Sequence, residues 1–239
     1  MTTDVQIGNS LIYSLKEALL IYRGTATRSG GKRAFVTRHP VETDNAGLPG
    51  IGPAGLLSQD FVRDLVRELE GTVALEVLPA NVLARTPETL CWWSPAATRV
   101  MFYRAEQSPE LARLSGQRCP QPALLFLLRS GQLSLRALAQ SKRPTSETEL
   151  FRAPYWNVSD SGSVCLGSTQ VPDSTALDSI NRWEKSFFES EFTHPNGTRR
   201  LVDHPKGFAG LWTELKDQAR FPARYLATAE ETLTQFLRI

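Results

Sequence analysis

Residues 124–137 read LLFLLRSGQLSLRA, and they decide the predicted fold. Two apolar runs, 124–128 and 133–137, are separated by Ser130-Gly131, a dipeptide typical of a tight hairpin turn. Two further short apolar runs, 90–93 and 99–103, precede this hairpin. Because no helical segment separates these neighbours, they favour an antiparallel meander over βαβ units. We therefore expect an α+β domain built on a four-stranded antiparallel meander.

The segments before the meander predict an N-terminal β-rich extension. Residues 40–57 are rich in glycine and proline, which indicates an ordered loop or linker. A serine cap followed by apolar residues at helical spacing predicts a helix over 58–70, which we expect to pack on the meander. The predicted organisation is an extension over 1–57 and a main domain over 58–239.

The segments after the meander differ from it in composition. Residues 142–173 are rich in Ser, Thr, Gly and Pro but also contain aromatic residues, which indicates a long irregular segment with a functional role. Apolar periodicity then predicts three helices at about 173–189, 208–219 and 227–238. The meander is therefore expected to be flanked by helices.

The composition excludes several classes of protein. With 239 residues and 41% hydrophobic content, the chain can build a core. A net charge of +2 provides no dedicated surface for nucleic acid, and no apolar run is long enough to span a membrane. The start, MTTD, has no signal-peptide character, and three cysteines do not make a disulfide framework. We expect a cytoplasmic globular protein with free thiols.

Cys165 is the candidate nucleophile among the three cysteines. It lies in GSVCLG (162–167), where a glycine on each side favours an irregular, approachable backbone. A thiolate is the best side-chain nucleophile near neutral pH. We expect Cys91, within a strand, and Cys119, in a loop, to be packed or inert. The alternative for Cys165 is that it too is a small buried apolar residue.

The longer stretch 153–166, APYWNVSDSGSVCL, resembles the active-site segment of ubiquitin-conjugating enzymes. In that family an Asn opens a turn, a glycine precedes the thiol by three residues, and the Cys follows the Asn by eight. Asn157, Gly162 and Cys165 occupy these three positions. The preceding meander, with prolines before its third strand, matches the fold that carries this segment in the family.

Further stretches are similar to a bacterial branch, prokaryotic ubiquitin-conjugating family D, which includes protein B of the PRTRC genetic system. They lie within residues 75–239: CWWSPA (91–96), RPT (143–145), CLGS (165–168) and SEFTH (190–194). The resemblance implies that Cys165 accepts a ubiquitin-like modifier from a ThiF-like activating enzyme and passes it to an amine of a target protein. It also implies that no metal or organic cofactor is needed, that a deconjugating metalloprotease accompanies the system, and that the system serves antiphage defence.

The chain departs from the family where Tyr155-Trp156 replaces the His-Pro before the Asn, which affects the hydrogen bonding of the loop more than the thiol chemistry. By resemblance Asn157 donates to the oxyanion that forms when an amine attacks the thioester, or holds the loop that does so. A plain turn residue is the alternative. Tyr155, Gly162 and His194 are the candidate accessory residues.

His194 leaves two interpretations open. A Cys–His pair could make the protein a thiol hydrolase, although no local signature of a cysteine peptidase is present. The alternative is a structural histidine at the end of an aromatic segment. A conjugating fold that has lost activity and only scaffolds the activating enzyme or the modifier is the competing class of function.

Two other motifs have simpler explanations. GIGPAG (50–55) satisfies G-x-G-x-x-G, but no strand is predicted before it and Pro53 removes an N–H, so a turn-rich connection is favoured over a dinucleotide site. A local basic cluster is interpreted as a solvated hairpin rather than a nucleic-acid contact; it comprises Arg23, Arg28, Lys32, Arg33 and Arg38. The sequence has no Cys-x-x-Cys or His-x3-His, so no metal site is predicted.

Overall fold

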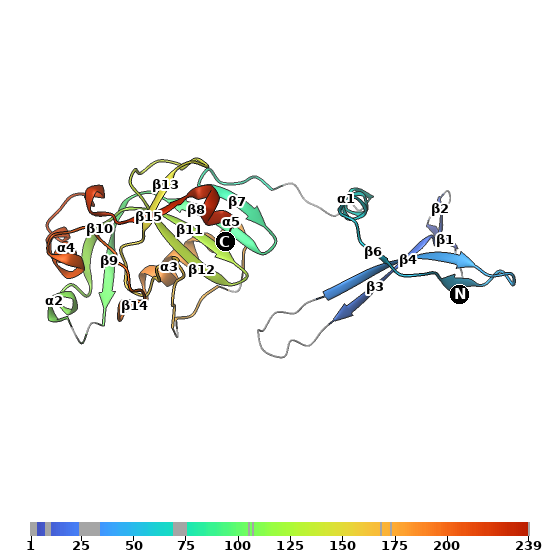
Figure 1. The fold of residues 1–239 in the computed structure, drawn as a ribbon, viewed down its shortest axis with the longest axis horizontal. Helices are drawn as coiled ribbons and strands as arrows, with labels where there is room; N and C mark the ends of the chain where they lie inside the picture. The colour runs from blue at the N-terminus through green and yellow to red at the C-terminus, as the bar shows by residue number, and fades with distance from the viewer. Residues whose placement is uncertain are drawn as a thin grey trace. The chain divides into compact units, whose positions relative to one another are not determined.

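A computed structural model describes residues 4–7, 11–23, 34–68, 76–104, 106, 108–167, 169–172 and 174–238. The chain divides into two compact units, Met1–Glu76 and Val77–Ile239 (Figure 1). Of the predicted basic cluster, Arg28, Lys32 and Arg33 lie outside the described residues. Each unit is described by itself below.

The first unit is β-rich, as the sequence predicted. Its elements are β1 (Asp4–Ile7), β2 (Leu11–Ser14), β3 (Glu17–Arg23), β4 (Ala34–Thr43), β5 (Pro49–Ile51), β6 (Gly55–Leu56) and α1 (Gln59–Glu68). The prediction of a loop over 40–57 is wrong in part, because β5 and β6 both pair antiparallel with β4. Glycines without side chains allow this close pairing, and the Gly52 N–H donates to the Pro40 carbonyl at 2.8 Å.

Helix α1 forms where the sequence predicted it, and the Ser58 hydroxyl accepts a hydrogen bond from the Phe61 N–H at 3.1 Å. None of its residues is buried, and it belongs to the first unit, whereas the predicted meander lies in the second. The predicted packing of this helix on the meander is therefore not confirmed.

The second unit is built on an antiparallel sheet with strand order β15-β13-β12-β11-β8-β7. These strands are β7 (Val82–Thr86), β8 (Thr89–Ser94), β11 (Ala123–Arg129), β12 (Gln132–Leu138), β13 (Glu149–Arg152) and β15 (Thr228–Thr232). The turn between β11 and β12 is Ser130-Gly131, as predicted, and both residues have positive φ values, 47° and 81°. The predicted α+β class is confirmed, with more strands than predicted.

The predicted four-stranded meander is wrong in one strand. β9 (Ala97–Tyr103) leaves the main sheet and pairs with β10 (Gln117–Gln121) and, in parallel, with β14 (Glu191–Phe192). The segment 117–121 was expected to be a loop, yet its Pro120 is tolerated because β10 is an edge strand of this second sheet. β11 takes the place beside β8 because nearly all of its residues are buried, as in a central strand.

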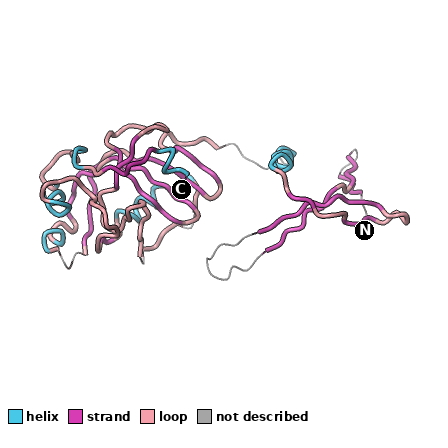
Figure 2. The backbone as a smooth tube through the Cα atoms, in the orientation of Figure 1, coloured by secondary structure: helices cyan, strands magenta, loops and turns pink. Residues whose placement is uncertain are grey.

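The helices of the second unit are short (Figure 2). They are α2 (Pro109–Ala112), α3 (Ile180–Phe188), α4 (Gly207–Leu215) and α5 (Leu233–Arg238), with 3₁₀ turns at Leu177–Ser179 and Ala223–Tyr225. The helix predicted at 227–238 is wrong in its first half, which is strand β15. Residues 142–173, expected to be irregular, contain β13. No helix in the described parts of the chain is long and apolar enough to cross a membrane.

The main sheet separates two apolar cores. The larger core contains Trp92, which stacks on Phe126 with ring centroids 5.0 Å apart. The smaller core lies under α5 and includes Leu125 and Phe236, and Trp93 packs against it. The two tryptophans therefore point to opposite faces, as strand alternation predicted. The first half of β12, which β13 does not pair with, carries the candidate site.

Candidate active site

Burial separates the three cysteines. Cys91 in β8 and Cys119 in β10 are buried, whereas Cys165 is exposed. Desolvation raises the pKa of the Cys91 thiol to about 12 and also raises the pKa of Cys119. Both are therefore poor nucleophiles, as expected, although Cys119 lies in a strand and not in the predicted loop. Cys165 is the cysteine that a partner protein can reach.

Residues 157–165 form a small hairpin that ends in this cysteine. Its arms are joined by the Cys165 N–H donating to the Asn157 carbonyl (2.7 Å), a bridge between Val158 and Val164, and the Ser159 N–H donating to the Ser163 carbonyl (2.9 Å). The Gly162 N–H closes the turn on the Ser159 carbonyl at 2.8 Å. Asn157 and Cys165 therefore lie opposite each other, as the predicted folded-back loop requires.

The hairpin is attached to the first half of β12, where β13 does not pair with that strand. Its second arm pairs with β12 through a bridge between Ser134 and Ser163. The Leu135 N–H donates to the Gly162 carbonyl at 2.8 Å, and the Val164 N–H donates to the Leu133 carbonyl at 2.9 Å. Cys165 therefore follows directly after a segment whose backbone is held by the sheet.

Only glycine fits at position 162, where the hairpin lies close to β12. Its φ is +89°, a region that residues with a Cβ rarely adopt. A Cβ there would lie 2.7 Å from the Leu135 carbonyl oxygen and would also collide with the Arg136 guanidinium. The chain reversal therefore needs a glycine at 162 for two reasons: the backbone conformation of this residue and its close contact with the sheet.

The Asn157 side chain fastens the hairpin to β14. Asn157 is 6% exposed and has a φ of +65°. Its Nδ2 donates to the Glu191 carbonyl at 2.8 Å, and its Oδ1 accepts from the N–H and the hydroxyl of Thr193, both at 3.3 Å. These contacts hold the loop, and no hydrogen bond among the described residues uses the second Nδ2 hydrogen, so the loop-holding and oxyanion roles both stay predictions.

His194 lies beside Asn157 through its backbone. The Asn157 N–H donates to the His194 carbonyl at 3.2 Å, and the exposed His194 ring contacts the Thr193 hydroxyl through Nδ1 at 2.8 Å. Among the described residues, no hydrogen bond joins the Cys165 thiol to an imidazole, so the thiol-hydrolase alternative gains no support. His204 is buried and bonded to Glu214 at 3.1 Å, at the start of α4.

Tyr155 supports the hairpin from the core. Its side chain is fully buried, and its hydroxyl donates to Gln121 Oε1 at 2.8 Å. Its ring stacks on Phe192 of β14 with centroids 5.7 Å apart. Desolvation raises the pKa of Tyr155 far above its usual value, so the phenol stays neutral. Tyr155 therefore braces the loop from inside and does not contact the thiol.

The sequence analysis missed three polar residues that hold the hairpin: Arg136, Asp160 and Glu231. Arg136 of β12 pairs with Glu231 of β15 and donates to the Asp160 carbonyl in the hairpin turn. An arginine among the apolar residues of a central strand was the available signal, because charged side chains are almost never fully buried unless paired.

These features define an α+β domain that presents one exposed cysteine on a short hairpin anchored to a sheet. A model of prokaryotic E2 family D matches residues 60–229, and the chain belongs to this family. Membership indicates a ubiquitin-conjugating-like role and fold, with a ubiquitin-like modifier and an activating enzyme as the general partners. No curated protein and no solved structure matches the chain.

Proposed function

We propose that this protein carries a ubiquitin-like modifier as a thioester on Cys165 and transfers it to an amine of a target protein. The observation that supports this most is the exposed Cys165 at the end of a sheet-anchored hairpin, opposite Asn157, in a chain of the prokaryotic E2 family. The other two cysteines are buried and cannot meet a protein-sized substrate.

The proposed reaction is two acyl transfers. The Cys165 thiolate attacks the C-terminal carbonyl carbon of the modifier, a new C–S bond forms, and the cysteine thiolate of the activating enzyme leaves. The amine of the target then attacks the same carbon, a C–N bond forms, and Cys165 leaves as thiolate. The amine loses one proton in this second step, so a nearby base assists it.

We propose His194 as this base, because its carbonyl accepts from the Asn157 N–H beside Cys165 and its ring is exposed. The Thr193 hydroxyl contacts both Asn157 Oδ1 and His194 Nδ1, and it has a single proton. Both contacts can be hydrogen bonds only if the Thr193 hydroxyl donates to Asn157 Oδ1 and His194 Nδ1–H donates to the hydroxyl oxygen. This tautomer leaves the lone pair of Nε2 on an exposed ring, free to accept a proton.

The test is a non-reducing gel after incubation with ATP, a ThiF-like activating enzyme and a ubiquitin-like protein. Wild type should form an adduct that a reducing agent removes, Cys165→Ser an adduct that resists reduction, and Cys165→Ala none. Cys91→Ala and Cys119→Ala are the controls and should load as wild type does. If Cys165→Ser still gives an adduct sensitive to reduction, the assignment is wrong; binding without any adduct on wild type identifies a scaffold instead.

A further inference from the structure

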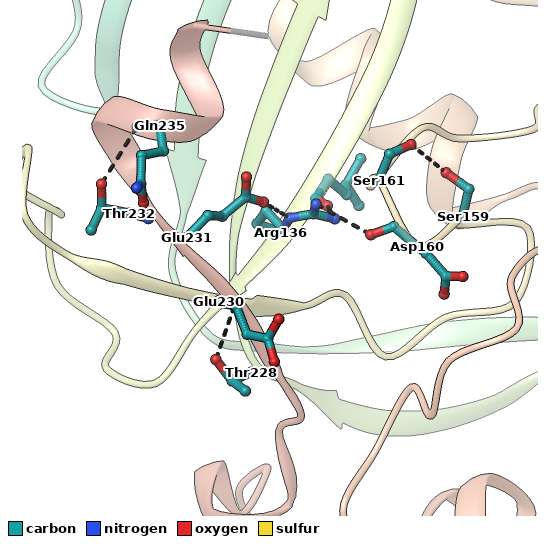
Figure 3. A network of polar contacts seen from close by, with 10 residues as sticks. Arg136, Ser159, Asp160, Ser161, Thr228, Glu230, Glu231, Thr232 and Gln235 are labelled. Atoms are coloured by element: carbon teal, nitrogen blue, oxygen red, sulfur yellow. Dashed lines mark hydrogen bonds and ion pairs between the residues drawn. The ribbon is translucent and has the colours of Figure 1, made fainter.

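Arg136 is a buried positive charge in the second unit, and it contacts the hairpin that ends in Cys165. It belongs to β12, and its side chain is 4% exposed. Figure 3 shows its guanidinium between Glu231 of β15 and Asp160 of the hairpin. We propose that Arg136 is a positioning residue, which fixes the hairpin and with it the place of Cys165 relative to the sheet. The effect on transfer rests on the proposed function, whereas the effect on the hairpin does not.

The guanidinium bonds one side-chain carboxylate and two backbone carbonyls at once. Nε donates to Glu231 Oε1 at 2.5 Å, and the two terminal nitrogens donate to the carbonyls of Asp160 (3.3 Å) and Leu135 (3.4 Å). An arginine fork presents five donors in one rigid plane, so a single side chain can hold a carboxylate and a carbonyl together. Glu231 is 14% exposed and supplies the countercharge that allows this burial.

The opposite side of the hairpin turn is held by the Asp160 carboxylate. It accepts from the Thr198 N–H (2.9 Å), the Thr198 hydroxyl (3.1 Å) and the Arg199 N–H (3.2 Å). Gly197 allows this approach, because a Cβ there would collide with the Asp160 side chain. The turn before Cys165 is therefore clamped between β12 and residues 197–199.

Stability alone does not account for a buried Arg136–Glu231 pair. The desolvation of two charges offsets much of their attraction, and apolar residues of similar size often serve a folded protein as well or better. An apolar side chain at 136 cannot donate to the Asp160 carbonyl. The contact with the hairpin is thus the part of the arrangement that requires an arginine.

Two variants separate positioning from stability. Arg136→Met/Glu231→Leu replaces the pair with apolar side chains, and Arg136→Lys keeps the charge pair but removes the fork. For the double variant we expect a urea midpoint close to wild type, and for both variants hydrogen exchange of a peptide covering 157–165 that is faster by about 10-fold or more. A peptide from β11 should keep its protection. The maximal rate of single-turnover thioester formation should fall by at least about 10-fold, without a change in the half-saturating concentration of charged activating enzyme.

If the double variant is as stable as wild type and its hairpin peptide exchanges hydrogen at the wild-type rate, the inference is overturned, because Arg136 is then only a packing residue. If the double variant does not fold, Arg136→Lys decides the same question, and hairpin exchange equal to wild type overturns the inference. If wild type forms no thioester, the proposed function fails while the exchange comparison still tests the positioning role.

Discussion

The tight contact between Gly162 and β12 makes Gly162→Ala the most informative single substitution. An alanine at φ +89° costs about 1–2 kcal/mol for the left-handed backbone. The added Cβ also collides with the Arg136 guanidinium and lies 2.7 Å from the Leu135 carbonyl oxygen. Overpacking of this kind costs about 1–3 kcal/mol. We therefore expect Gly162→Ala to lower the free energy of unfolding by about 2–5 kcal/mol.

Gly131→Ala is the matched control. Gly131 has a similar φ of +81°, but a Cβ there would meet no atom within 4 Å. Its substitution should therefore cost only the backbone part, about 1–2 kcal/mol. All five tryptophans lie between residues 92 and 212, so tryptophan fluorescence during urea unfolding reports on the second unit.

The difference between the two variants isolates the contact with β12. We expect Gly162→Ala to be less stable than Gly131→Ala by at least about 1 kcal/mol, and to form the thioester more slowly because the Cys165 arm is displaced. If the two unfolding free energies agree within about 0.5 kcal/mol and both variants load at the wild-type rate, the hairpin is not held against the sheet as described.

Three further substitutions test the remaining parts of the site. His194→Ala should slow discharge of the thioester onto free lysine by about 10²-fold at pH 7 and leave loading intact; equal discharge rates would exclude it as the base. Asn157→Ala should reduce loading, discharge and stability together, the last by about 1–3 kcal/mol, because the Glu191 carbonyl and the Thr193 N–H lose their partner; loss of discharge alone would support the oxyanion role instead. The hydrogen bond from the Thr198 N–H lowers the pKa of Asp160 in the folded protein. The ionised Asp160 carboxylate therefore stabilises the fold fully above the ordinary carboxyl pKa of about 4, and this stabilisation is lost as the pH falls through the lowered folded-state pKa. The urea midpoint of Asp160→Asn should accordingly lie below wild type at pH 7 and approach it at pH 3; a constant difference would contradict this.

Local patterns were sufficient for part of the fold. The hairpin of β11 and β12 was predictable because its strands are adjacent in sequence and its turn residues require positive φ. The partner of β9 was not, because β9 pairs with β10 and then with β14, which follows in the chain only after α3. The segment TAEET of β15 shows no alternation of apolar and polar residues that would indicate a strand. Its apolar neighbours Leu226 and Leu233 have helical spacing instead, which led to the prediction of a helix. Its place is set by pairing with β13, a tertiary contact.

The same division applies to the site. Asn157, Gly162 and Cys165 were identifiable because their spacing is the spacing of one hairpin, whose hydrogen bonds are local. Arg136 and Glu231 lie 95 residues apart, and nothing in the local sequence of either indicates the other. Sequence reasoning therefore found the cysteine, the turn and Asn157, but not the Arg136–Glu231 pair that contacts the turn.

The replacement of the family's His-Pro by Tyr155-Trp156 follows from the same geometry. In this chain the residue two positions before Asn157, Tyr155, points into an aromatic core, where its hydroxyl donates to Gln121 and its ring stacks on Phe192 of β14. The hairpin is instead held by backbone pairing with β12 and by the Asn157 side chain on Glu191. None of these contacts involves the Cys165 thiol, so the hairpin can be held in this way without changing the surroundings of the thiol. The replacement of the family's His-Pro is therefore compatible with the proposed thioester chemistry at Cys165.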